Sequence, residues 1–180
     1  GLEEAYIAAD ALAIEKSTFR GCTALRRVVL AGSVSTIEGE MDSGAFQGCT
    51  SLTEVVFPDT LNNHIQTNAF YGCTALETVD LSNTQLQGIG QLAFGYCTNL
   101  KTVKLPGTAQ WVKCNSFMAT PNLQESEVGE RTTALEVRAG VVSTTDFYAS
   151  ESPRPAISGP AGAVRTAAVI LGGTERLKRA

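Results

Sequence analysis

Residues able to carry chemistry are scarce in this sequence of 180 residues, which has one histidine, one tryptophan and two methionines. It contains no Cys-x-x-Cys pair, no Gly-x-Ser-x-Gly segment, no Gly-x-x-x-x-Gly-Lys-Ser/Thr phosphate loop and no Asn-x-Ser/Thr glycosylation acceptor. These absences argue against a paired-cysteine zinc site, a hydrolase elbow and a nucleotide-binding loop. We therefore expect no catalytic residues, no metal and no cofactor.

An excess of positive charge is also absent, because 14 basic side chains face 18 acidic ones and the net charge is -4. Proteins that bind nucleic acids usually show a strong basic balance. We expect no nucleic-acid partner.

Long apolar runs are missing as well. The longest one near the end, Ala167–Leu171, is far too short to cross a bilayer. Glu3 and Glu4 stand where the basic region of a signal peptide would lie. We expect no membrane-spanning segment here, and a leader or anchor upstream of Gly1 is left open.

One sequence motif recurs through the first two thirds of the chain. It contains a phenylalanine, a cysteine and a leucine that follow each other at intervals of three residues. Its phenylalanines follow each other at intervals of 27, 24, 24 and 23 residues. A period in the twenties is typical of a solenoid, in which stacked repeats share one core. The copies are Thr18–Leu25, Ala45–Leu52, Ala69–Leu76, Ala93–Leu100 and the degenerate Ser116–Leu123.

Each repeat has three predicted parts. An aliphatic residue precedes the phenylalanine by five positions, and the Phe-x-x-Cys segment favours a short helical or 3₁₀ turn, since positions i and i+3 share a face. The closing Leu-x-x-Val-x-Leu alternates with period two, which predicts a short strand that pairs with those of neighbouring rungs. The aliphatic positions are Ile14, Met41, Ile65, Ile89 and Val112.

The repeat resembles the BspA-like (Treponema-type) leucine-rich repeat, in the form Ile-x-x-x-Ala-Phe-x-Gly-Cys-Thr-x-Leu-x-x-Val-x-Leu-Pro. The resemblance implies a repeat solenoid with a parallel β-sheet on one face and short helical or 3₁₀ turns and loops on the other. It also implies a curved interaction surface, as in bacterial and protist surface proteins, some of which mediate adhesion.

The repeat pattern divides the chain into three parts. We expect residues 1–128 to form the solenoid, with a partial first repeat and about five rungs. Residues 129–150 read as a degenerate terminal rung or cap, since Ala134–Val137 alternates like a strand. Residues 151–180 begin with a Pro/Gly/Ser-rich linker and continue as a tail, disordered or with a short helix over 163–179. Because the chain opens in the middle of a repeat, we expect further repeats upstream.

Four of the five cysteines, Cys22, Cys49, Cys73 and Cys97, share one repeat position and predict a column of thiols. We interpret them as buried structural residues, because free cysteine behaves as a small hydrophobe with a weak S–H donor. Disulfides remain open if the protein is extracellular. Cys114 lies outside the column.

His64 and Trp111 are single examples of their residue types. His64 follows Asn62 and Asn63, and we expect it in a surface turn, where it would lack a nucleophile as a partner. Trp111 precedes Val112, and its position favours either the core or the edge of the stack.

The outward positions of the predicted strands are the candidate binding residues, because the repeat does not dictate their type. They are Arg27, Val29, Glu54, Val56, Thr78, Asp80, Thr102, Lys104, Glu125 and Glu127. In leucine-rich repeats this face is typically concave and binds partners; solvent-facing filler is the alternative. We expect a non-catalytic module that binds a protein partner, in a surface or secreted adhesion-type protein. The alternative is an intracellular scaffold or regulatory repeat domain attached to another, catalytic or non-catalytic, domain.

Overall fold

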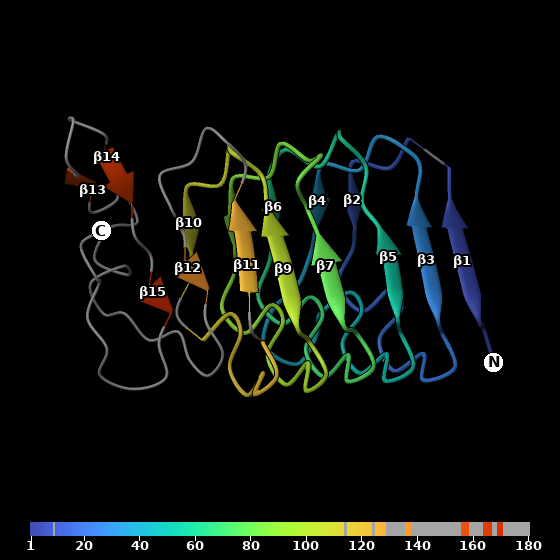
Figure 1. Ribbon diagram of the computed structural model, residues 1–180. Helices are drawn as coiled ribbons and strands as arrows, with labels where there is room; N and C mark the ends of the chain where they lie inside the picture. Colours follow the sequence, from blue (N-terminus) through green and yellow to red (C-terminus); the bar gives the residue numbers. More distant parts are fainter. Residues whose placement is uncertain are drawn as a thin grey trace.

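The structure is a computed structural model that describes residues 1–8, 10–113, 115–123 and 125–128, and the strand residues 136–137, 156–158, 164–166 and 169–170. Successive rungs stack along one axis, and two layers of parallel strands run along the stack (Figure 1). The predicted repeat solenoid with a parallel sheet is confirmed.

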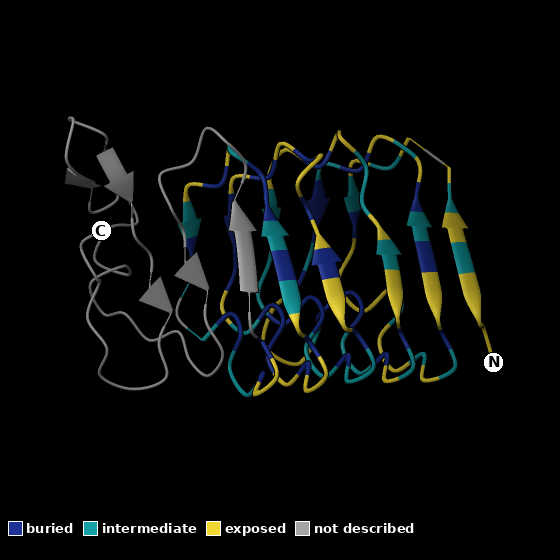
Figure 2. Cartoon of the chain, viewed as in Figure 1, coloured by how far each residue is buried: buried dark blue, intermediate teal, exposed yellow. Residues whose placement is uncertain are grey.

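The front layer consists of the strands predicted from Leu-x-x-Val-x-Leu. They are β1 (Glu4–Ile7), β3 (Arg27–Leu30), β5 (Glu54–Val56), β7 (Thr78–Asp80), β9 (Thr102–Leu105) and β11 (Glu125–Val128). Buried and more exposed residues alternate along β3, β7 and β9 (Figure 2). This alternation follows from the pleat, which sends successive side chains to opposite faces.

The back layer is a second parallel sheet of two-residue strands. They are β2 (Ala13–Ile14), β4 (Thr36–Ile37), β6 (His64–Ile65), β8 (Gly88–Ile89) and β10 (Trp111–Val112). The sequence predicted only turns and loops on this side. The aliphatic residues of the repeat form these strands and point into the core, where Ile65, Ile89 and Val112 are fully buried.

One aliphatic assignment was wrong. The structure places Ile37, not Met41, in the stack, because Ile37 pairs in register with Ile14 on β2 and with Ile65 on β6. Met41 is 79% exposed in the loop that follows. The longer first interval therefore reflects an insertion between the strand and the phenylalanine, which displaces the spacing of five.

The Phe-x-x-Cys segments, for which the sequence predicted a short helical or 3₁₀ turn, form successive turns closed by hydrogen bonds between residues three apart. Within one turn, the Cys22 N–H donates to the Phe19 carbonyl at 3.1 Å and the Leu25 N–H to the Cys22 carbonyl at 3.0 Å. Between rungs, the Phe46 N–H donates to the Ala69 carbonyl at 2.8 Å, and the same bond recurs along the stack. These turns thus form a third hydrogen-bonded column beside the two sheets.

The core is a column of phenylalanine rings between the two sheets. Neighbouring rings are nearly parallel, tilted by 2–7°, with centroids 4.9–5.5 Å apart. Offset stacking at such distances adds to the burial free energy of each ring. The column runs through Phe19, Phe46, Phe70, Phe94 and Phe117.

The turn two residues after each phenylalanine needs a left-handed backbone. Gly21, Gly48 and Gly72 adopt it with φ of 71–74°, which glycine does without steric cost. Tyr96 and Ala119 occupy the same position with φ of 59° and 55°. The repeat therefore contains glycine here because the backbone must adopt a positive φ. In the last rungs Tyr96 and Ala119 adopt it with steric strain.

The remaining described strands lie in the last third of the chain. β12 (Glu136–Val137) pairs with β15 (Val169–Ile170) in parallel, and β13 (Ala156–Ser158) pairs with β14 (Val164–Thr166) in antiparallel fashion. For residues 163–179 the sequence allowed either disorder or a short helix, and the structure has the strands β14 and β15 there. Most of the predicted cap and tail lies outside the described residues, so the boundary at residue 128 stays a prediction. No helix long and apolar enough to span a membrane occurs in the part of the chain that the structure describes.

Candidate interaction surface

The outward side of the front layer, which we call the front face, presents two rows of side chains. Within each of the two paired groups, β1-β3-β5 and β7-β9, parallel pairing in register places the first outward residue of each strand beside its counterpart, and likewise the second. The first row is Glu4, Arg27, Glu54, Thr78 and Thr102, and the second is Tyr6, Val29, Val56, Asp80 and Lys104.

All ten predicted binding residues lie on front strands. The eight on β3, β5, β7 and β9 are exposed or half-buried, whereas Val28, Val79 and Val103 between them are buried. Glu125 and Glu127 lie in β11, in register with Thr102 and Lys104. The strand periodicity therefore identified eight residues that reach this surface, and the role of all ten in binding stays a prediction.

Two residues of the front face were missed. Glu4 and Tyr6 on β1 pair in register with Arg27 and Val29, and the Tyr6 side chain is 70% exposed. The signal was present in the sequence, because Leu2-x-x-Ala5-x-Ile7 fixes the same alternation in the partial first repeat.

The second row of the front face begins as an apolar patch. Tyr6, Val29 and Val56 lie side by side on β1, β3 and β5, and Val56 is 40% exposed. Val55 and Phe57 in the same segment are half-buried, although the equivalent Val28 and Leu30 are fully buried. We call Tyr6, Val29 and Val56 the apolar row.

Charges border the apolar row and neutralise one another in pairs. Arg27 Nε lies 2.8 Å from Glu54 Oε2, and Lys104 Nζ lies 3.8 Å from Asp80 Oδ2. Hydrogen bonding to Glu54 raises the pKa of the Arg27 guanidinium further. Exposed ion pairs are screened by water and contribute little to stability. These side chains can therefore exchange their partners for those of a bound protein at little cost.

The front ladder is interrupted between β5 and β7. The strands pair as β1-β3-β5 and as β7-β9-β11, and no pairing joins β5 to β7 within the described chain. The Ser82 N–H donates to Asp80 Oδ1 at 3.0 Å, whereas its counterpart Ala31 donates to Ile7 on the preceding rung. A side chain that captures a nearby backbone donor competes with the ladder in this way.

Three of the four thiols in the column are buried, as interpreted from the sequence, whereas Cys22 in the first rung is half-buried. Cys49, Cys73 and Cys97 are free and fully buried, and each Sγ lies 3.0–3.2 Å from the phenylalanine carbonyl of the preceding rung. Burial raises the pKa of Cys49 and of Cys97 to about 12 and that of Cys73 well above its ordinary value. These thiols are therefore poor nucleophiles at neutral pH. Cys114 lies outside the described residues.

His64 was expected in a surface turn and instead begins strand β6. Its ring lies 4.8 Å, centroid to centroid, from the indole of Trp111 on β10. Burial first and the nearby Lys113 charge second lower the pKa of His64 below 6.5. Trp111 lies half-buried on the outside of the back sheet, so of its two predicted positions the edge of the stack is correct.

Comparisons with known proteins agree with this architecture. A family model described as BspA type leucine-rich repeat region matches residues 1–41 and 12–139, in six copies. A leucine-rich repeat protein of T. pallidum is 30% identical, with a TM-score of 0.60 over 70% of this chain and 59% of that one. One from Bacteroides ovatus ATCC 8483 is 24% identical, with a TM-score of 0.60 over 69% of this chain and 33% of that one, and shows the fold alone. No curated protein matches the chain.

Proposed function

Because the chain belongs to the BspA-type leucine-rich repeat family, whose repeats are typically non-catalytic protein-interaction modules, we propose that it binds a protein partner through the front face. The partner lies across β1, β3 and β5, where the apolar row is most exposed. The chain spans 59% and 33% of the two solved neighbours, so the proposal concerns this repeat region.

The apolar row is the observation that carries the proposal. A tyrosine and two valines in register on three strands offer apolar area on a rigid support, and tyrosine is enriched among residues that dominate binding energy. The Arg27–Glu54 ion pair beside them supplies charge that can select a partner and guide its approach.

The setting that we propose is the cell surface or the extracellular space, in an adhesion-type protein. Support comes from the family resemblance, since BspA-like repeats are common in surface proteins. The partner would then be an extracellular protein of a host or a matrix.

A binding assay against a panel of extracellular-matrix proteins, by surface plasmon resonance, tests the proposal. Tyr6→Ser with Val56→Ser should weaken binding at least about tenfold, as expected when an interface loses more than about 1.4 kcal/mol. Arg27→Glu with Glu54→Arg keeps the ion pair and the net charge while it inverts the pattern, and should also weaken binding.

The matched control is Lys16→Glu with Glu40→Lys, which inverts an exposed ion pair off the front face. It should bind like the wild type. A matrix protein that binds both front-face variants as tightly as the wild type would show that the partner uses another surface. If the wild type binds none of the matrix proteins in the panel, the proposed extracellular setting is contradicted.

The thiol column favours a second candidate, an intracellular scaffold or regulatory repeat domain. Three thiols donate hydrogen bonds to carbonyl groups, which requires reduced sulfur, and a reducing compartment maintains this state. Titration of thiols in protein that is alkylated during cell lysis and then unfolded separates the two settings. Fully reduced cysteines favour the intracellular setting, and disulfides favour secretion.

A further inference from the structure

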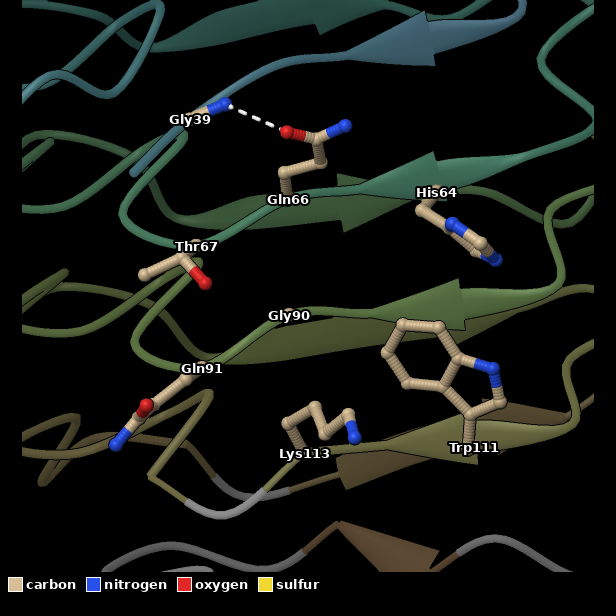
Figure 3. Close-up of a pocket in the computed structure, with 8 residues that line it drawn as sticks. All are labelled: Gly39, His64, Gln66, Thr67, Gly90, Gln91, Trp111 and Lys113. Atoms are coloured by element: carbon tan, nitrogen blue, oxygen red, sulfur yellow. Dashed lines mark hydrogen bonds between the residues drawn. The ribbon is translucent and has the colours of Figure 1, made fainter. Parts of the chain in front are cut away.

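A second surface, on the back sheet, is hollowed into a pocket of about 320 Å³ (Figure 3). It lies over β6, β8 and β10, on the other layer from the front face. Its volume is near the lower end of the range for ligand pockets, roughly 300–1,000 Å³. It therefore suits a ligand of one or two rings.

The pocket exists because one rung lacks side chains. Gly88 and Gly90 occupy the two outward positions of the β8 rung, where the rung before carries His64 and Gln66 and the rung after carries Trp111 and Lys113. The glycine backbone thus forms a floor, and the side chains of the two neighbouring rungs form the walls. The rest of the pocket is closed at one end by polar residues, Thr67 and Gln91 among them.

Trp111 lies flat across this floor. A Cβ atom on Gly88 would lie 2.1 Å from Trp111 Cε2 and 2.4 Å from Cδ2, so only glycine leaves room for the indole. One face of the indole therefore covers Gly88, and Figure 3 shows the ring between His64 and Lys113. Contact with His64 at 4.8 Å between ring centroids holds it in place.

The polar groups around the indole are mostly uncharged. The Gly39 N–H donates to Gln66 Oε1 at 3.3 Å, which fixes the carboxamide and leaves its NH₂ group as the donor end. Gln91 supplies a second amide, and the His64 imidazole, neutral at pH 7, offers one donor and one acceptor. Such groups match hydroxyl groups, which both donate and accept.

The same set disfavours other ligands. The lining includes no carboxylate to coordinate a divalent cation, and only one cation, Lys113, which is too few for a polyphosphate. Lys113 Nζ lies over the indole ring, 5.3 Å from its centre, and so shares the outward face of the ring with any ligand that packs there.

We propose that this pocket is a carbohydrate site, in which one pyranose ring lies above Gly90 in contact with the indole of Trp111 and bonds through its hydroxyl groups to Gln66 and Gln91. The apolar C–H face of a sugar suits an aromatic surface, and its hydroxyl rim suits amides. The positive charge of Lys113 would allow the site to bind an acidic sugar as well as a neutral one.

Because Trp111 is the only tryptophan, its fluorescence reports this pocket directly. The whole chain is titrated with methyl glycosides of neutral hexoses, with an N-acetylhexosamine and with a hexuronic acid. We expect a saturable change in intensity or wavelength for at least one class. A response to the acid alone that is lost in Lys113→Gln identifies an acidic sugar, and a response to neutral glycosides identifies a neutral one.

Gln91→Ala should weaken the response at least about tenfold, the loss expected when a hydrogen-bonding partner is removed. Gln110→Ala is the matched control, because Gln110 is also an exposed glutamine next to Trp111 in sequence but outside the pocket. Gln66→Ala provides a second test, and unchanged thermal unfolding confirms that each variant is folded. No saturable response to any glycoside, or one that Gln91→Ala and Gln66→Ala leave unchanged, overturns the proposal.

Discussion

Three thiols occupy the same position on successive rungs and make the same hydrogen bond there. Cys49, Cys73 and Cys97 fill fully buried positions and donate to the phenylalanine carbonyl of the preceding rung, as Cys73 does to Phe46 at 3.2 Å. At the degenerate rung Thr120 takes this place and donates to Phe117 of its own turn at 2.6 Å. A small side chain with one donor is what the position requires, and a reactive thiolate is not.

The buried thiols should make the protein sensitive to alkali. Folding raises the pKa of Cys97 from 9.0 to about 12, so above pH 9 the unfolded chain loses a proton that the folded chain keeps. The free energy of unfolding therefore falls as the pH rises, by roughly 1 kcal/mol per buried thiol between pH 9 and pH 10. Urea unfolding at pH 8 and pH 10 measures this change.

Cys97→Ala should reduce the loss between the two pH values by about one thiol's share, roughly 1 kcal/mol. Leu76→Val, a core substitution that removes no thiol, should lose as much stability as the wild type over the same pH interval. An unchanged loss in Cys97→Ala would show that this thiol ionises as readily in the folded protein as in the unfolded chain.

Among the elements, the short strand β4 shows where repeat spacing misleads. Strand pairing selects Ile37 for the stack, between Ile14 and Ile65, and the eight residues between Ile37 and Phe46 include an insertion. Counting back from Phe46 instead selects Met41. Burial and register, which depend on neighbouring rungs, settle which residue belongs to the core.

Substitutions at these two positions should differ sharply. Ile37→Ala leaves a cavity at a fully buried site and should cost about 2–5 kcal/mol. Met41→Ala, at a position that is 79% exposed, should change stability by less than about 0.5 kcal/mol. Urea unfolding at neutral pH measures both, and equal losses would mean that Met41 belongs to the stack after all.

At the scale of the whole molecule, three hydrogen-bonded columns hold the rungs together, and one of them is broken. The front ladder stops between β5 and β7, while the turn column continues there through Phe46 and Ala69 and the back sheet through Ile37 and Ile65. The phenylalanine column also passes the break, with Phe46 and Phe70 4.9 Å apart. The stack is therefore continuous although its front surface is divided.

Native-state amide hydrogen exchange, followed by NMR, should reveal the break. The N–H groups of Arg26, Thr53 and Lys101 each donate to the preceding rung at 2.7–2.9 Å, whereas the equivalent Glu77 N–H has no such bond in the described structure. We expect Glu77 to exchange at least about tenfold faster than Thr53 and Lys101. Equal protection at these sites would show that β5 and β7 pair in solution.

The sequence by itself determined the period, the class of fold and the inward residues other than Ile37. Phe70, Cys73 and Leu76 repeat at a fixed distance, and one rung cannot bury them alone, so stacking is the one arrangement that hides them all. Alternation in Leu-x-x-Val-x-Leu also identified the front-face residues, and would have identified Tyr6 had the partial first repeat been read in the same way.

The tertiary structure alone decided the rest, because those features depend on residues far apart in the chain. The back sheet consists of two-residue strands, too short to leave a periodic signal, and forms only when rungs pair. The gap between β5 and β7 depends on which acceptor takes the Ser82 N–H. The pocket forms where Gly88 lies beside Trp111 and His64, which belong to rungs more than twenty residues away in the chain. The repeat spacing does not predict this contact.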